Sequence, residues 1–272
     1  MDKALVIGIA DYGFLNQNLP GCAADRQEWA GYLKPKLNLT DATLRLLADG
    51  TATREAIIDG VRWLLADAGP DDERVMFFAG HGARLRRIGT GPVQETLVAS
   101  PGAVERPYDD FMIYDADLAQ MIDEADVPPK TRVTLIFDSC HSGGMLRKLV
   151  LGGGLNSDGA LPRCLYIPDA SEEFFSANVA PFARTFNALA RNAETPRLVM
   201  AAATAQQSAW DDRMSDGKRH GVFSFYCVKE LAQAPTHTIA AVMAAVSTQV
   251  AARFPQSPQL LGDQSRFDHP LF

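Results

Sequence analysis

The stretch TRVTLIFDSCHSGG, residues 131–144, decides the expected fold because it joins an apolar strand directly to a run of reactive and small side chains. Its first half has the length and the β-branched content of a strand buried in a sheet. An acid, a serine, a cysteine and a histidine follow, and then two glycines. Because ligands of α/β proteins bind beyond the carboxyl ends of parallel strands, this arrangement indicates a functional site on such a fold.

Four further apolar runs of strand length occur along the chain, separated by segments in which apolar residues recur every three or four positions. The runs are residues 4–10, 43–49, 74–80 and 196–204, and the helical segments are residues 24–33, 52–66, 118–125, 222–231 and 238–254. Strands that alternate with helices predict a mostly parallel sheet covered by helices on both faces.

The composition of the 272 residues, with 47% hydrophobic and 22% charged, is that of a globular protein, and we take one domain as the default. The apolar run near the N-terminus ends at Asp11, too early for a signal peptide or a membrane span. A net charge of −7 argues against nucleic acid or an anionic membrane as the main partner. The four cysteines show no zinc-binding spacing, so we expect a cytoplasmic location.

Two reactive side chains follow two of the predicted strands: His81 in AGHGAR and Cys140 in FDSCHS. If these strands are neighbours, the imidazole and the thiol share a water-accessible crevice, where the imidazole can take the thiol proton near pH 7. Gly80 and Gly82 flank the histidine and let a substrate carbonyl approach backbone N–H groups that form an oxyanion hole. Each residue alone has a plainer explanation, as a small buried hydrophobic side chain or a turn residue.

The combination of FFAGHG, residues 77–82, with IFDSCHSGG, residues 136–144, closely resembles the histidine and cysteine motifs of the caspase-like peptidases, specifically the metacaspases. The resemblance extends over nearly the whole chain, through ALVIGIADYG, LPGCAAD, FMIYDADL, LVMAAATAQQSAWD and GVFSFYCVKEL. It implies a caspase-like three-layer α/β sandwich, in which a mostly parallel central sheet of about six strands is flanked by helices.

The resemblance also implies roles for individual residues. Cys140 corresponds to the nucleophile and His81 to the general base, and the backbone N–H groups of Gly82 and Cys140 correspond to the oxyanion hole. Asp138 is expected to point to the same side as Cys140, and with Asp25 it implies a pocket for a substrate Arg or Lys. A plainer explanation of Asp25 is that the dipole of a helix favours an acid in its first turn.

The sequence departs from the metacaspase pattern at several positions. Ala79 stands where metacaspases commonly carry a serine, so one hydrogen bond of the pocket is expected to be absent. Gln94 and Ala116 stand where calcium-dependent members carry acids, and Arg147 follows the cysteine motif. Because a calcium ion needs several oxygen ligands, we expect no metal site, no cofactor and weak or absent calcium dependence.

The resemblance divides the single domain, residues 1–272, into a large catalytic portion (1–145), a flexible linker (146–195) and a small portion (196–272). Apolar spacing predicts an amphipathic helix over residues 175–189 of the linker. The linker holds the basic residues Arg147, Lys148 and Arg163, which we expect to be exposed. Cleavage there, by the chain itself or by an upstream protease, would activate a zymogen.

We therefore predict a cysteine endopeptidase that cleaves protein or peptide substrates after Arg or Lys. The alternative is a catalytically silent caspase-like protein that binds partners as a scaffold. An α/β-hydrolase is less favoured because no GxSxG or GxCxG elbow surrounds Cys140. A nucleotide-binding fold is weaker still, because the chain contains neither GxGxxG after the first strand nor GxxxxGK[ST].

Overall fold

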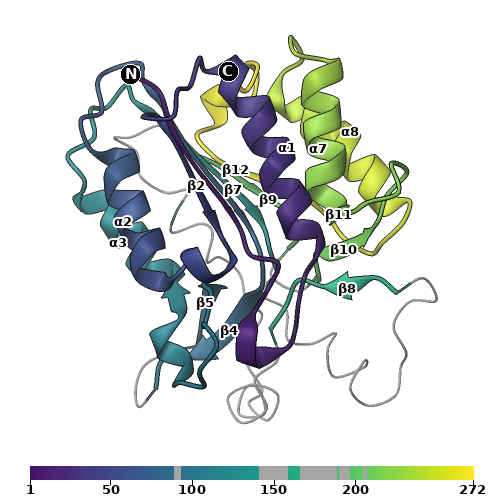
Figure 1. Cartoon of the computed structure of the whole chain (residues 1–272). Helices are drawn as coiled ribbons and strands as arrows, with labels where there is room; N and C mark the ends of the chain where they lie inside the picture. The colour runs from purple at the N-terminus through teal and green to yellow at the C-terminus, as the bar shows by residue number, and fades with distance from the viewer. Residues whose placement is uncertain (89–92, 141–158, 166–188, 190–196, 205–206) are drawn as a thin grey trace.

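The structure is a computed structural model that describes residues 1–88, 93–140, 159–165, 189, 197–204 and 207–272. A six-stranded sheet in the order β12-β9-β7-β3-β1-β2 forms its centre (Figure 1). Its strands are β1 (Lys3–Gly8), β2 (Leu44–Ala48), β3 (Glu73–Ala79), β7 (Arg132–Asp138), β9 (Arg197–Ala201) and β12 (Gln259–Gly262). All pair in parallel except β12, which runs antiparallel to β9. The predicted mostly parallel sheet of about six strands is confirmed.

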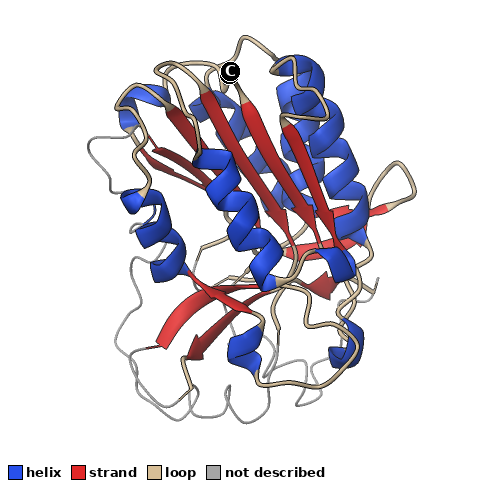
Figure 2. Ribbon diagram, turned by 60° about the vertical axis from the view of Figure 1, so that its left-hand side comes forward, coloured by secondary structure: helices blue, strands red, loops and turns tan. Residues whose placement is uncertain are grey.

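Helices cover both faces of this sheet and make three layers (Figure 2). On one face lie α1 (Gly21–Lys36), α7 (Val222–Gln233) and α8 (Ile239–Ala251). On the other face lie α2 (Arg54–Leu65) and α3 (Asp115–Glu124). The five helices correspond to the five helical segments outside the linker, so the predicted three-layer sandwich is confirmed. Short 3-10 helices connect some elements: η1 (Gly13–Leu15), η2 (Asp49–Thr51), η3 (Tyr108–Asp110) and η4 (Gln264–Arg266).

Side-chain caps explain where two of these helices begin. The Thr53 hydroxyl accepts the Ala56 N–H at 3.2 Å and caps α2, and the Thr238 hydroxyl accepts the Ala241 N–H at the same distance and caps α8. Each cap satisfies an N–H that has no partner inside its helix and contributes about 1 kcal/mol.

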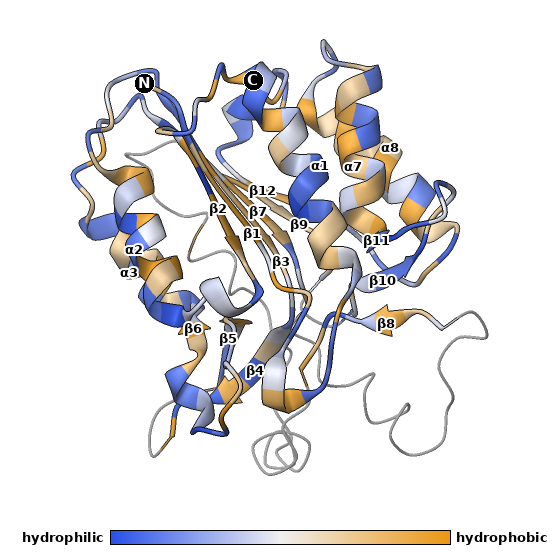
Figure 3. Cartoon of the chain, viewed as in Figure 1, coloured by the Kyte–Doolittle hydropathy of each residue, from blue (hydrophilic) through white to orange (hydrophobic). Residues whose placement is uncertain are grey.

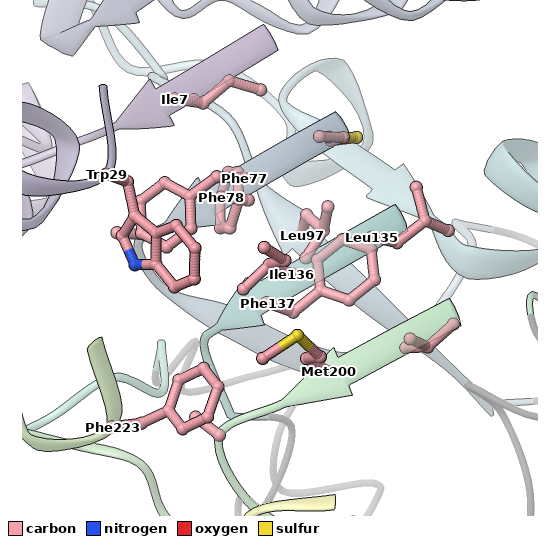
Figure 4. Packing of buried hydrophobic residues seen from close by; sticks show 14 of the residues in the cluster. Ile7, Trp29, Phe77, Phe78, Leu97, Leu135, Ile136, Phe137, Met200 and Phe223 are labelled. Atoms are coloured by element: carbon pink, nitrogen blue, oxygen red, sulfur yellow. The ribbon is translucent and has the colours of Figure 1, made fainter. Parts of the chain in front are cut away.

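The core lies between the sheet and the helices, and the central strands are its most hydrophobic part (Figures 3 and 4). Trp29 of α1 stacks on Phe77 of β3 with ring centroids 5.1 Å apart. Its indole N–H also donates to the Ser224 hydroxyl of α7 at 3.2 Å. Burying one such large side chain contributes roughly 1.5–3 kcal/mol. These contacts hold the middle of α1 and the first turn of α7 against each other and against the sheet.

Two smaller sheets lie at the carboxyl ends of the parallel strands (Figures 1 and 2). One contains β4 (Gly82–Arg86), β5 (Val93–Val98) and β6 (Met112–Tyr114), and the other contains β8 (Leu161–Pro162), β10 (Trp210–Arg213) and β11 (Arg219–Gly221). Neither was predicted, because their strands are short and lack a long apolar run.

The predicted helix over residues 175–189 lies outside the described residues except for Leu189. Within the described ranges, no helix combines the length and apolar character that crossing a bilayer requires.

Candidate active site

His81 and Cys140 follow two neighbouring strands of the central sheet. β3 and β7 pair in parallel with Ala79 opposite Asp138, and each reactive residue comes two positions after the end of its strand. Their side chains therefore belong to the same rim of the sheet, as the sequence pattern predicted. Gly82 begins β4 immediately after His81.

The expectation of a water-accessible crevice is wrong, because residues 159–165 fill it. His81 is 2% exposed and Cys140 is 1% exposed. The expected exposure of Arg163 is also wrong, since this residue is 0% exposed. The physical reason is that buried carboxylates compensate the charge of its guanidinium, so the arginine can leave water. Arg147 and Lys148 lie outside the described residues.

The segment that fills the crevice is bound through its backbone. Strand β8 pairs antiparallel with β10, with Leu161 opposite Asp211 (Figure 1). The Arg163 N–H then donates to the Ala209 carbonyl at 2.9 Å. Two residues later, the Leu165 N–H donates to the Gly82 carbonyl at 2.8 Å. The segment thus passes between β10 on one side and the start of β4 on the other.

The Arg163 carbonyl lies at the two backbone N–H groups that the resemblance assigns to an oxyanion hole. Its oxygen accepts the Gly82 N–H at 3.0 Å and the Cys140 N–H at 3.2 Å. Two N–H groups aimed at one oxygen stabilise negative charge that develops on it.

Three buried carboxylates surround the Arg163 guanidinium. Nη1 lies 3.1 Å from Asp138 Oδ2, and Nη2 contacts Asp25 Oδ2. Nη2 also lies 3.4 Å from Asp211 Oδ2. Asp25 and Asp138 are the two pocket residues that the resemblance implied. Asp211 was missed, although it ends the quoted motif LVMAAATAQQSAWD and that motif was the available signal.

Two helix N-termini hold these carboxylates in place. The hydrogen bonds join Asp138 Oδ2 to the Ser224 N–H (3.0 Å), Asp25 Oδ2 to the Gly221 N–H (2.9 Å) and Asp211 Oδ2 to the Gly21 N–H (2.8 Å). Ser224 and Gly221 belong to the first turn and the N-cap of α7, and Gly21 is the first residue of α1. Unsatisfied N–H groups and the positive end of the helix dipole favour carboxylates at both places.

Asp25 therefore has a different role from the plainer one considered for it. It is the fifth residue of α1, and α1 has no acid in its first turn. Its carboxylate reaches across to the N-cap of α7 instead of capping its own helix. The explanation through the dipole of its own helix is wrong.

Burial and the neighbouring arginines shift the pKa values of the pocket acids in opposite directions. Burial raises the pKa of Asp138 to about 6, although the Arg163 guanidinium lowers it. Burial also raises the pKa of Asp211, against the effect of Arg163 and of Arg219, whose Nε lies 2.7 Å from Asp211 Oδ1. Loss of the guanidinium would remove the stabilising charge from both carboxylates. The pocket therefore favours a cation.

His220 is a second residue that the sequence pattern did not indicate. Its Nδ1 lies 3.1 Å from Asp25 Oδ1 and its Nε2 lies 3.0 Å from Asp216 Oδ2. Burial lowers the pKa of His220, but the two carboxylates raise it by more, so its pKa lies above the usual value. The ring holds Asp25 in position on the side away from Arg163.

The surroundings of His81 suit a general base. Its Nε2 lies 2.6 Å from the Gln17 carbonyl, which can only accept, so Nε2 carries the proton. In the neutral ring Nδ1 then has a lone pair, and it has no hydrogen-bond partner among the described residues. Burial lowers the pKa of His81 to about 4, although the Gln17 carbonyl acts in the opposite direction. The ring is neutral at pH 7 and can accept a proton.

Tyr12 positions this histidine and was also missed. Its hydroxyl accepts the His81 backbone N–H at 2.6 Å, and the two ring centroids are 4.5 Å apart. Tyr12 is fully buried and belongs to the quoted motif ALVIGIADYG.

Cys140 lies beside the peptide bond that follows Arg163. Its Sγ is 4.0 Å from the Ala209 carbonyl, the same oxygen that accepts the Arg163 N–H. The Cys164 Sγ donates to the Leu165 carbonyl at 3.9 Å, and the neighbouring Cys140 side chain together with burial raises the pKa of Cys164 well above its usual value.

Within the described part of the chain, no three His, Cys, Asp or Glu side chains are grouped so that they could hold a metal ion. Glu95 and Asp115 do lie near each other, and they are neighbours in the chain of Gln94 and Ala116, which stand where calcium-dependent metacaspases carry acids. Burial and the charge of Glu95 raise the pKa of Asp115 to about 7. Two carboxylates supply fewer oxygen ligands than the six to eight that calcium typically takes.

Comparison with protein families identifies the family to which the chain belongs. The family model described as the caspase domain matches residues 1–267. This chain belongs to the caspase-domain family of cysteine peptidases. Its relatives include Metacaspase-1B of Aspergillus niger, which is 27% identical over 307 residues, covering 99% of this chain and 65% of that protein. Metacaspase-1 of Scheffersomyces stipitis is 25% identical over 297 residues, covering 95% of this chain and 70% of that protein.

A solved structure shares the fold of this caspase-domain chain. Protein GSU0716 from Geobacter sulfurreducens superposes with a TM-score of 0.70 over 99% of this chain and 97% of that one. The two sequences are 18% identical, so this likeness concerns the fold. The predicted caspase-like sandwich is confirmed.

Proposed function

We propose that this chain is a cysteine endopeptidase that cleaves proteins or peptides after Arg or Lys, with Cys140 as the nucleophile and His81 as the general base. One observation carries the proposal. Arg163 places its guanidinium among three buried carboxylates while its carbonyl oxygen accepts the N–H groups of Gly82 and Cys140. A residue before a cleaved bond must satisfy both conditions, because its side chain is recognised where its carbonyl is attacked.

The reaction follows from the positions of these groups. Neutral His81 takes the Cys140 proton, and the thiolate attacks the substrate carbonyl while the two N–H groups stabilise the oxyanion. The C–N bond breaks, His81 gives its proton to the leaving amine, and a thioester remains on Cys140. Water then attacks the thioester with His81 again acting as base, and the substrate carboxylate and the Cys140 thiol are released.

The charge of the pocket supports the preference for a basic residue. Asp25, Asp138 and Asp211 meet at one guanidinium, and all three are buried. A substrate cation compensates these charges, whereas an acidic side chain would add a further buried negative charge at large cost. Arginine can contact all three acids through its two Nη atoms, and lysine has only one terminal nitrogen.

The substrates, location and activation of the enzyme complete this proposed function. We propose peptide or protein substrates, a cytoplasmic location, no nucleic-acid or membrane partner, and activation by cleavage within residues 146–195. Such cleavage is carried out by the chain itself or by an upstream protease. The net charge of −7 supports the absence of nucleic acid, and the acidic pocket supports a basic residue before any bond that the chain cuts itself.

Hydrolysis of short peptides by a chain with an emptied pocket tests the proposed function. Arg163→Gln removes the arginine that occupies the pocket, and fluorogenic peptides ending in Arg, Lys or Asp are then compared. We expect cleavage after Arg and Lys and none after Asp. Cys140→Ala in the same background is expected to abolish cleavage, whereas Cys227→Ala, which alters a buried cysteine of α7 outside the site, retains it.

The scaffold alternative makes the opposite prediction for the same assay. A catalytically silent protein would release no fluorophore with any of the three peptides, and Cys140 would react with an arginine chloromethyl ketone no faster than a free thiol does. Either result with folded protein would remove the peptidase proposal.

Chelation tests the proposed absence of a calcium requirement. Because Gln94 and Ala116 replace expected acids, and because no three His, Cys, Asp or Glu side chains of the described residues are grouped to hold a metal ion, we expect EGTA to leave kcat/KM for an Arg peptide unchanged. The assay is run in the Arg163→Gln background with and without added calcium. Loss of activity in chelator and its return with calcium would show that the proposal is wrong.

A further inference from the structure

Backbone hydrogen bonds hold residues 160–165 in place both before and after one peptide bond, the bond between Arg163 and Cys164. On the N-terminal side, β8 pairs with β10 and the Arg163 N–H donates to Ala209. On the C-terminal side, Cys164 forms a bridge with Gly82, and the Leu165 N–H donates to the Gly82 carbonyl. An extended peptide that adds to a strand in this way is a common form of peptide recognition.

The reacting groups of the proposed mechanism converge on this bond. The Arg163 carbonyl accepts both N–H groups of the oxyanion hole, and its guanidinium fills the acidic pocket. The Cys140 Sγ lies 4.0 Å from the Ala209 carbonyl, the oxygen that also accepts the Arg163 N–H. His81 directly precedes Gly82 in the chain, and its Nδ1 has no hydrogen-bond partner among the described residues. Arg163 alone therefore fills both the acidic pocket and the oxyanion hole, as the residue before a cleaved bond would.

We infer that residues 160–165 are an internal substrate: Cys140 cuts the Arg163–Cys164 bond of its own chain, and until that cut the Arg163 side chain keeps other substrates out of the acidic pocket. This inference rests on the proposed peptidase function. It assigns one bond out of the 146–195 region and adds that the uncut segment inhibits the enzyme.

The self-cleavage step uses only groups that are present. His81 takes the Cys140 proton, a C–S bond forms to the Arg163 carbonyl carbon, and the bond to the Cys164 nitrogen breaks. His81 protonates that nitrogen, which becomes a new N-terminal amine. Water hydrolyses the thioester, leaving a carboxylate on Arg163 and restoring the Cys140 thiol.

Burial makes the cut intramolecular. Ala160, Arg163 and Cys164 are each at most 1% exposed, so a second protease molecule cannot reach this bond without unfolding the segment. Groups held in place within one chain react as though at very high local concentration, on the order of 10⁵ M or more. The rate of the cut is therefore expected to be independent of protein concentration.

Intact mass and N-terminal sequencing of the purified full chain test the assigned bond. Wild type is expected to yield fragments 1–163 and 164–272, the second beginning with Cys164, at a first-order rate that does not change on dilution. Cys140→Ala and Arg163→Gln are expected to remain uncut. The matched control, Arg147→Gln with Lys148→Gln, removes two other basic residues of the region and is expected to be cut like wild type.

The outcomes separate this inference from the proposed function. If Arg163→Gln hydrolyses Arg peptides while folded wild type remains whole or is cut elsewhere, the internal-substrate inference is wrong and the peptidase function stands. If neither cut nor peptide hydrolysis occurs, the function itself fails. Arg163→Lys guards against misfolding, because it keeps a cation in the pocket and is expected to be cut at the same bond, more slowly.

Peptide binding tests the inhibitory part. A fluorescent Ala-Leu-Pro-Arg peptide, copied from residues 160–163, is titrated into Cys140→Ala and into Cys140→Ala with Arg163→Gln. Because the internal arginine occupies the pocket only in the first protein, we expect the second to bind at least about tenfold more tightly. Equal affinities would show that the segment does not block the site.

Discussion

Replacing Gly221 with alanine is expected to lower kcat/KM for arginine peptides by about two orders of magnitude without unfolding the chain. A Cβ at this position would lie 2.1 Å from Asp138 Oδ2 and 2.5 Å from Arg163 Nη1, inside the space that the guanidinium occupies. The backbone of Gly221 has φ −65° and ψ 128°, which alanine adopts readily. The effect is therefore steric exclusion from the pocket and not backbone strain.

Gly31→Ala is the matched control for this change. Gly31 lies in α1, and a Cβ there would meet no heavy atom within 4 Å. The substitution is expected to leave peptide hydrolysis unchanged and to stabilise the helix by up to about 1 kcal/mol. Both variants are compared in the Arg163→Gln background, by steady-state kinetics and thermal unfolding. Full activity of Gly221→Ala would mean that the arginine side chain of a substrate binds elsewhere.

Asp138→Asn is expected to reduce kcat/KM for arginine peptides by about 10²- to 10³-fold. Its carboxylate lies 3.1 Å from Arg163 Nη1 and is fully buried, and removing one member of such a pair costs about 2–5 kcal/mol. Asparagine keeps the size of the side chain and can still accept the Ser224 N–H, so the change removes mainly charge. The measurement is kcat/KM in the Arg163→Gln background.

A pH profile distinguishes a binding role for Asp138 from a structural one. The pKa of Asp138 is raised to about 6, and only the ionised form attracts a guanidinium, so wild-type hydrolysis is expected to fall as the pH drops through about 6. In Asp138→Asn this part of the profile should disappear. Asp41→Asn, which alters a carboxylate with a side chain 99% exposed, is the control and is expected to keep both rate and profile. An unchanged profile in Asp138→Asn would contradict the assignment.

The layered fold was predictable because it depends on local pattern. The run RVTLIFD is apolar over a strand length and becomes β7, and the helical spacing of residues 52–66 becomes α2 (Arg54–Leu65). Parallel pairing then brings the ends of β3 and β7 together, so His81 and Cys140 could be placed at one rim from the sequence. Strand β12 and the two small sheets were not predicted, since their strands are short and lack a long apolar run.

The interior of the site depends on contacts that no local pattern reveals. Asp25 accepts a hydrogen bond from Gly221, 196 positions away in the chain. Asp211 is held by the N–H of Gly21, 190 positions away. Arg163 was noticed as a basic residue of the linker, but its burial follows from the three carboxylates it meets, which come from separate elements.

The meeting of α1 and α7 at the pocket has a consequence for selectivity. Their N-termini already orient the three carboxylates, so a guanidinium enters a preorganised site and little reorganisation energy is spent on its arrival. Recognition is thereby concentrated in a single side chain. Peptide substrates whose sequences differ at other positions are therefore expected to be cleaved with similar efficiency, provided that an arginine precedes the cut bond.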